Sequence, residues 1–391
     1  MTSTLITNIG QLVTNDPTHD GTKLGLIKDG ALLIEDGVIA WAGPTADAPT
    51  KQIKKSIDAE GMCVLPGYVD SHTHMIFAGD RSNEFRARML GESYTSGGIA
   101  STVEKTRNAS NALLLSHAQF LLAEAHAGGT TTVEIKSGYG LTVKDERRSL
   151  EIASAMTEET TFLGAHVVPL EYRDSPKDYV DLVCGPMLDA AQSYAKWIDV
   201  FCDKGAFAVD DARRILKAGI AKGLLPRIHA NQLQEGQGIS LGVELDAASV
   251  DHVSHASEKD IELLSTSKTV ATLLPGAEFS TRSAYPDVRP LLEASITVAL
   301  ASDCNPGSSY TTSMAFIIAI AVREMHFSPE QAIWSATMGG AKALRRSDIG
   351  HLIEGARADF QILNAPSYIH LAYRPGVNLV EQVWRNGLQL I

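Results

Sequence analysis

The sequence predicts an α/β protein in which a TIM-like (β/α)₈ barrel carries a small composite β-sandwich built from both termini. Eight apolar, strand-like runs alternate with helical periods between residues 61 and 354, and this alternation is typical of such a barrel. Both ends of the chain contain short β-like runs, but neither end has enough of them to bury a two-sided core. We therefore expect the β-sandwich to combine residues 1–60 with residues 355–391.

Turn dipeptides divide the two terminal segments into strands. The first segment contains Asp29-Gly30 and Asp36-Gly37, and the last contains Asn386-Gly387. Asp-Gly and Asn-Gly are the strongest short-range signals of a two-residue hairpin, because both central positions of that turn need a left-handed backbone. We expect a hairpin at each of the three dipeptides.

The barrel strands are expected at apolar runs that end in polar or glycine-rich loops. The eight runs lie within residues 65–81, 130–140, 161–169, 196–205, 225–231, 247–255, 269–276 and 296–307. The seventh, 269–276, is equally compatible with a short buried helix. Among the helices, residues 101–104 read as a capping box that opens a helix ending at Gly128-Gly129, and further helical segments are expected at 210–223 and 257–264.

Composition indicates a globular protein and argues against nucleic-acid binding and membrane association. Hydrophobic residues make up 44% and charged residues 20% of the chain, as in ordinary globular proteins. The net charge of −12 gives no basic surface for nucleic acid or an anionic membrane, so an anionic small-molecule substrate would need a local cation. The longest apolar stretch, 314–322, is far below the roughly 20 residues of a membrane span. Four widely spaced cysteines fit a reducing compartment, and we expect a cytoplasmic protein without a signal peptide.

Polar residues fall at the ends of several predicted strands. His72 and His74 are two apart on a strand, so they project to the same face and can share one metal ion. Further strand ends carry His166, His229, His252, His255 and Asp303. Any one of these alone would more often be a packed or loop residue. Together they predict a metal-dependent active site, because the carboxyl ends of barrel strands converge on one mouth.

Three segments, HTHMIFAGDR (72–81), EIKSGYGL (134–141) and SDCNPGSS (302–309), resemble the amidohydrolase superfamily. Within it they look most like the ring-opening hydrolases of histidine degradation. The resemblance covers essentially the whole chain, including IGHLIEGARADFQIL (349–363). It implies hydrolysis of 4-imidazolone-5-propanoate to N-formimidoyl-L-glutamate with a bound zinc or iron ion, divalent or trivalent.

The same resemblance implies the residues that would hold the metal. The ligands carry over onto His72, His74, His229 and Asp303, and Asp303 would also take the proton of the attacking water. His252 would polarise the attacked carbonyl or orient the nucleophile. The fourth strand ends Cys202-Asp203-Lys204, without the carboxylated lysine of related binuclear enzymes, which favours one metal. We expect Lys136 to be a supporting cation and His255 to be structural.

The substrate contacts are also implied by the resemblance. Those on the carboxylate side of the substrate carry over onto Arg81, Tyr139, His166, Asn305, Gly307 and Ser308. Arg81 can grip a carboxylate bidentately, and Tyr139 and His166 are expected to donate further hydrogen bonds. Some relatives have Glu three residues after the third histidine ligand, where this chain has Gln232. An amide cannot exchange protons near neutral pH, so Gln232 is expected to hydrogen-bond the ring amide of the substrate.

Two other functions remain open from the sequence. The first is an aminohydrolase of the same superfamily acting on a purine, pyrimidine or pterin, which would not need an Arg-Tyr-His grip for an alkyl carboxylate. The second is a non-catalytic scaffold on this fold, whose metal ligands would usually be eroded. We expect a homodimer, since that is usual for such folds.

Overall fold

The computed structural model describes residues 3–50, 53–91 and 98–391. The chain divides into two compact units. The terminal unit comprises Met1–Ser71, Ala123–Thr132 and Ser313–Ile391, and the barrel unit comprises His72–Leu122 and Val133–Thr312.

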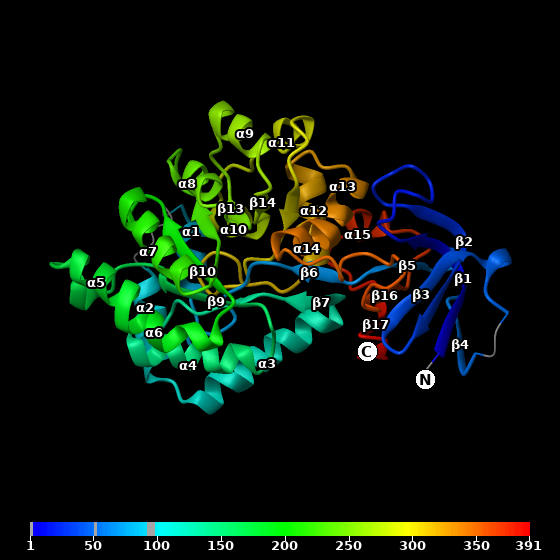
Figure 1. The fold of residues 1–391 in the computed structure, drawn as a ribbon, viewed down its shortest axis with the longest axis horizontal. Helices are drawn as coiled ribbons and strands as arrows, with labels where there is room; N and C mark the ends of the chain where they lie inside the picture. The colour runs from blue at the N-terminus through cyan, green and yellow to red at the C-terminus, as the bar shows by residue number, and fades with distance from the viewer. Residues whose placement is uncertain (1–2, 51–52, 92–97) are drawn as a thin grey trace. The chain divides into compact units, whose positions relative to one another are not determined.

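The terminal unit contains an eight-stranded sheet built from both ends of the chain (Figure 1). Its strands are β1 (Ser3–Val13), β2 (Leu26–Glu35), β3 (Val38–Pro44), β4 (Lys55–Asp58), β5 (Cys63–Pro66), β16 (Phe360–Leu363), β17 (Val380–Arg385) and β18 (Leu388–Gln389). Their order is β18-β17-β16-β5-β1-β2-β3, with β4 beside β1. The antiparallel pairing of β5 with β16 joins the two ends of the chain, so the predicted composite of both termini is confirmed.

Two of the three predicted hairpins are confirmed. Asp36-Gly37 joins β2 to β3 and Asn386-Gly387 joins β17 to β18, and all four residues have the positive φ that a two-residue turn requires. The prediction at Asp29-Gly30 is wrong, because this dipeptide lies inside β2. Asp29 does adopt a positive φ of 51°, beside an irregularity in the pairing of β1 with β2. A bulge uses the same left-handed backbone as a turn, so the dipeptide alone could not distinguish them.

The remaining elements of the terminal unit are short. The strands β6 (Tyr68–Asp70) and β7 (Thr130–Val133) form a two-stranded sheet. The helices are α12 (Met314–Glu324), α13 (Pro329–Trp334), α14 (Gly340–Ala343) and α15 (His370–Tyr373). A capping box between Ser328 and Gln331 opens α13, and Phe360 stacks on Trp384 in the core of the large sheet.

The barrel unit contains a parallel sheet that closes on itself. Its strands are β8 (Ile135–Lys136), β9 (Thr160–Ala165), β10 (Trp197–Cys202), β11 (Leu225–Pro226), β12 (Ile228–Ala230), β13 (Ser249–His252), β14 (Val270–Leu273) and β15 (Val298–Leu300). Residues 72–74 join the two ends of this sheet: His74 N–H donates to the Cys304 carbonyl, and Lys136 N–H donates to the Thr73 carbonyl. The predicted barrel is confirmed, and the uncertain run 269–276 contains a strand, β14.

Helices separate the barrel strands (Figure 1). They are α1 (Ser82–Met89), α2 (Ile99–Asn108), α3 (Asn111–Ala127), α4 (Val143–Ser154), α5 (Pro176–Leu182), α6 (Leu188–Ala191), α7 (Val209–Ala221), α8 (Gly238–Glu244), α9 (Glu258–Ser265), α10 (Pro275–Thr281) and α11 (Arg289–Glu293). The helices expected at 210–223 and 257–264 correspond to α7 and α9. In the described part of the chain, no helix has both the length and the apolar character that crossing a membrane requires.

The predicted capping box at 101–104 is wrong. The helix begins earlier, at Ile99, and the Ser101 hydroxyl donates to the Gly98 carbonyl instead of capping. The expected single helix is also interrupted after Asn108, and Ser110 caps its second part by accepting a hydrogen bond from Leu113 N–H at 3.2 Å. Serine is a preferred N-cap, so Ser110 opens a new helix, which ends as predicted before Gly128-Gly129.

Candidate active site

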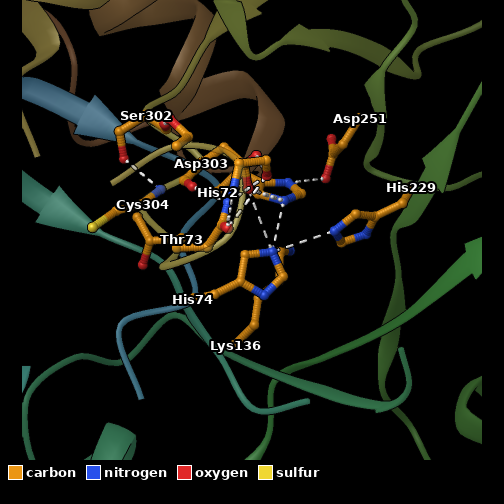
Figure 2. Close-up of polar contacts among 12 residues, drawn as sticks. His72, Thr73, His74, Lys136, His229, Asp251, Ser302, Asp303 and Cys304 are labelled. Atoms are coloured by element: carbon orange, nitrogen blue, oxygen red, sulfur yellow. Dashed lines mark hydrogen bonds and ion pairs between the residues drawn. The ribbon is translucent and has the colours of Figure 1, made fainter. Parts of the chain in front are cut away.

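Three histidines and one aspartate converge at the end of the barrel strands (Figure 2). Nε2 of His74 lies 3.3 Å from Nε2 of His72 and 3.4 Å from Nε2 of His229. Oδ1 of Asp303 lies 3.7 Å from Nε2 of His72 and 3.6 Å from Nε2 of His74. In a tetrahedral site with bonds of about 2.1 Å, neighbouring ligand atoms are about 3.4 Å apart. His72, His74 and Asp303 therefore have the spacing of ligands to a common metal ion, with His229 beside His74, and His72, His229 and His252 form a second group close enough to hold an ion.

The orientation of the rings supports the same conclusion. Nδ1 of His72 lies 2.7 Å from Oδ2 of Asp251, and Nδ1 of His229 lies 3.0 Å from Oδ2 of Asp199. A carboxylate can only accept, so Nδ1 of His72 carries the proton and its Nε2 keeps its lone pair. Burial lowers the pKa of His72 and His74 well below 6.5, so both rings are neutral. Converging lone pairs repel one another unless a cation lies between them, and the donor set is that of a metal site.

Beneath these ligands lie five fully buried charged side chains, which we call the charge layer. They are Glu134, Lys136, Asp199, Arg227 and Asp251. Nζ of Lys136 lies 2.9 Å from Asp199, and Nη2 of Arg227 lies 3.3 Å from Asp251. Burial alone would raise the pKa of Asp199, but His229 and Lys136 outweigh it and hold that pKa well below its usual range. Each carboxylate that orients a histidine ligand is thus itself paired with a buried cation.

Glu134 ties the charge layer to the first strand of the barrel. Its Oε2 accepts the backbone N–H of Thr73 at 3.1 Å, and its carbonyl accepts the Thr73 hydroxyl at 2.6 Å. Thr73 lies between His72 and His74, so these bonds fix the backbone that carries both ligands. Nζ of Lys136 lies 3.0 Å from Oε1 of Glu134, in keeping with the supporting role expected of Lys136.

Sequence reasoning missed most of the charge layer. It did not single out Glu134, Asp199, Arg227 or Asp251. A signal was present, because Asp199 in WIDVFC and Asp251 in ASVDH interrupt apolar barrel strands. A charge on a buried strand is costly unless it is paired, so such a residue points to a buried partner.

A cavity of about 30 Å³ lies beside the candidate metal ligands. Its lining includes the expected site residues except His72 and Gly307, and it adds Ile99 and Phe201. His72 faces the other ligands as described above. The exposed His255 does not line this cavity.

Arg81 is the cation of the cavity and is only 5% exposed. Its Nε and Nη2 donate to the two carboxylate oxygens of Glu84 at 2.9 and 2.6 Å. Its guanidinium lies against Gly98 and Gly307, where a Cβ on either glycine would collide with it. The absence of side chains at these two positions and the bidentate bond to Glu84 hold Arg81 in place at the cavity wall.

His166 differs from the donor role expected from the sequence. Its Nδ1 lies 2.9 Å from the Gly138 carbonyl, which can only accept, so Nδ1 carries the proton. Burial, and then the neighbouring His229, lowers the pKa of His166 to about 3. The neutral ring therefore offers Nε2 as an acceptor. Tyr139 packs beside it, with ring centroids 5.2 Å apart.

The loop after β15 is organised by Asn305. Its Oδ1 accepts the backbone N–H groups of Gly307 and Ser308, each at 2.8 Å, and its Nδ2 donates to the Asp303 carbonyl at 2.7 Å. Arg88 of α1 holds the same loop by donating to the Gly307 carbonyl at 2.8 Å. These bonds fix the backbone of Asp303, which has a left-handed φ of 53°.

Comparisons with known proteins identify the family of this chain. The amidohydrolase family model matches residues 229–388. The imidazolonepropionase of Mycolicibacterium smegmatis is 61% identical over 387 residues, covering 99% of this chain and 97% of that protein. The chain belongs to the imidazolonepropionase family. The imidazolonepropionase of Streptomyces griseus is 58% identical over 392 residues, covering 100% of both chains.

Two solved structures with bound zinc share the fold. Atrazine chlorohydrolase from Arthrobacter aurescens superposes with a TM-score of 0.72 at 16% identity, covering 99% of this chain and 95% of that one. An adenosine deaminase from Xanthomonas campestris gives a TM-score of 0.71 at 18% identity, covering 99% and 92%. At these identities the likeness shows the fold of this family member, not its substrate.

Proposed function

We propose that the chain hydrolyses the ring amide of 4-imidazolone-5-propanoate to N-formimidoyl-L-glutamate, a step of histidine degradation. The observation that carries this function is the 61% identity to an imidazolonepropionase over 99% of the chain. The cavity supports it, because it combines candidate metal ligands with Arg81, a cation suited to an alkyl carboxylate.

A single metal ion, zinc or iron, would be held by His72, His74, His229 and Asp303. Such an ion supplies Lewis acidity and makes a bound water nucleophilic near neutral pH. The charge layer contains three carboxylates and two cations, and Asp303 adds one more negative charge. A divalent ion would neutralise this buried set, so the balance favours a divalent over a trivalent ion. An apoprotein that bound a trivalent ion as tightly as zinc at the same pH would contradict this preference.

Asp303 and His252 would act on the reacting atoms. Asp303 takes a proton from the attacking water and delivers it to the ring nitrogen that leaves as the C–N bond breaks. Burial, and then His229, lowers the pKa of His252 well below 6.5. The neutral His252 ring therefore stabilises the developing oxyanion by donating a hydrogen bond and not by carrying a full charge.

The other cavity residues would hold the substrate. Arg81 pairs with the propionate, with Tyr139 donating to the same carboxylate. His166, as an acceptor at Nε2, suits an N–H of the substrate better than its carboxylate. Gln232 hydrogen-bonds the ring amide, and Ser308, whose Oγ lies 3.5 Å from Oδ2 of Asp303, lines the same cavity.

The test is a turnover assay on imidazolone propanoate generated in place from urocanate, beside a panel of purines, pyrimidines and pterins. Ring opening with no deamination of the panel is expected, with a metal content near one ion per chain. Deamination of a nucleobase without ring opening would favour the aminohydrolase, and a metal content near two in fully active protein would contradict the mononuclear site.

We also expect a cytoplasmic homodimer, and light scattering of the purified protein would measure its oligomeric state.

A further inference from the structure

The backbone that carries His252 is strained. His252 is the last residue of β13 and Val253 follows it, with φ values of 78° and 57°, so two consecutive non-glycine residues adopt the left-handed conformation. This conformation is uncommon for any side chain and is an outlier for a β-branched one such as Val253. Each such residue costs of order 1–3 kcal/mol and persists only where the surroundings hold it.

One side of this turn is held by backbone hydrogen bonds. Val253 N–H donates to the Ala230 carbonyl at 3.1 Å, and His255 N–H donates to the Asn231 carbonyl at 2.9 Å. Both acceptors belong to β12 or the residue directly after it, next to the ligand His229. These bonds tether the turn to the preceding strand of the barrel.

The other side of the turn is held by a side chain from the next strand and helix. The Ser254 hydroxyl donates to Oε1 of Glu278 at 2.5 Å, a short bond of the kind that a carboxylate accepts. Glu278 lies in the first turn of α10, directly after β14, and is only 4% exposed. Within the described residues, no group hydrogen-bonds to its other oxygen, Oε2.

A glutamate is a costly residue for this position. A buried carboxyl group with one oxygen unsatisfied destabilises the fold, and an apolar side chain would fill the same space at lower cost. Burial raises the pKa of Glu278 to about 7, which reflects the same cost. A residue that lowers stability beside a strained backbone next to an active site is more readily explained by function than by packing.

We propose that Glu278 is a positioning residue: through Ser254 it holds the left-handed turn at His252 and Val253, and so fixes the His252 imidazole against the reacting carbonyl. This inference rests on the proposed function, from which the catalytic role of His252 is taken. It extends that function to a residue on α10 that touches neither substrate nor metal ligands. Because His252 would act on the oxyanion, a displaced ring should lower kcat and leave KM unchanged.

The test compares variants of the metal-loaded enzyme. Ser254→Ala and Glu278→Ala remove the bond, and each should lower kcat about 10- to 100-fold, the range expected for a catalytic group displaced by about 1 Å. KM and metal content should stay close to wild type. Ser254→Thr and Glu278→Gln retain a donor and an acceptor and should restore most of kcat. The double alanine variant should lose no more than the worse single one, because the two residues act as one pair.

A substrate-independent measurement separates this inference from the proposed function. In the zinc enzyme with isotope-labelled histidine, the ring signals of His252, assigned with His252→Gln, should shift in Ser254→Ala and return in Ser254→Thr. Glu262→Ala, on the exposed face of α9, is the matched control and should shift nothing. The inference would be overturned if Ser254→Ala left the His252 signals unchanged and kept kcat within twofold of wild type. This result would decide the question even if Glu278→Ala did not fold. A wild type without ring-opening activity would instead refute the proposed function, and the NMR comparison would still decide the role of Glu278.

Discussion

The buried carboxyl group of Glu278 predicts how stability depends on pH. Burial raises its pKa from 4.5 to about 7 in the folded protein. A carboxyl whose folded-state pKa lies above its unfolded value binds more protons when folded, so it stabilises the fold at low pH. This contribution is fully present below about pH 4.5 and is lost as the pH rises through about 7.

The magnitude follows from the two pKa values. Their difference, at about 1.4 kcal/mol for each pH unit, gives about 3 kcal/mol of unfolding free energy. Glu278→Gln keeps the shape of the side chain and the acceptor for Ser254 but cannot ionise. Its unfolding free energy relative to wild type should therefore rise by up to about 3 kcal/mol between pH 4.5 and pH 8.

The assay is urea unfolding of wild type and Glu278→Gln at pH 4.5, 6, 7 and 8, monitored by circular dichroism. Groups that titrate identically in both proteins, including the metal ligands, cancel in the difference. Glu262→Gln, at an exposed position of α9, is the control and should give a constant difference across this range. If wild type and Glu278→Gln have parallel stability curves from pH 4.5 to pH 8, the reasoning about the buried carboxyl group is refuted.

Three further predictions concern the candidate site. Arg81→Ala should lower kcat/KM for imidazolone propanoate by roughly 30-fold to several thousand-fold, because an unpaired buried carboxylate costs about 2–5 kcal/mol. For an imidazolone without the propionate, Arg81→Ala should leave kcat/KM almost unchanged. Equal losses of kcat/KM on both substrates would show that Arg81 supports the loop and does not bind the propionate. Asp303→Asn should fold but lose turnover, and wild-type activity with metal bound would exclude Asp303 as the base. Lys136→Met should weaken metal binding about 10- to 100-fold in chelator competition, and unchanged affinity would show that the charge layer does not support the ligands.

The strands and the convergence of the candidate ligands could be predicted because they depend on local pattern. Apolar runs alternate with helical periods along the sequence, and His72 and His74 lie on one face of a strand whatever the rest of the chain does. Strand-end histidines such as His229 needed one further step, the convergence of parallel strands in a closed barrel. That step requires only the fold class, so it succeeded without knowledge of any contact.

Helix ends and turns were less reliable, because two local patterns can compete for one place. Ser101 and Ser110 both resemble N-caps, and only the position at which one helix ends and the next begins decides that Ser110 caps a helix. Asp29-Gly30 and Asp36-Gly37 are identical dipeptides, yet the first lies within β2 and the second forms the hairpin. Pairing with neighbouring strands decides between them, and a short sequence window does not contain that pairing.

The supporting residues of the site could not be predicted, since their roles exist only in the tertiary structure. Asp199 and Asp251 are each one charge on an apolar strand, and their partners are distant in sequence: Lys136 lies on β8, and Arg227 lies between β11 and β12. Burying any one of these charges alone would cost several kcal/mol, so none is tolerable until its partner is in place. The sequence identifies the candidate ligands because they lie at the ends of strands, whereas the charges that orient them are recognisable only once the barrel has brought them together. A charged residue within a predicted barrel strand is therefore best interpreted as half of an unidentified pair, and its most informative test is a double-mutant cycle with each opposite charge on the neighbouring strands.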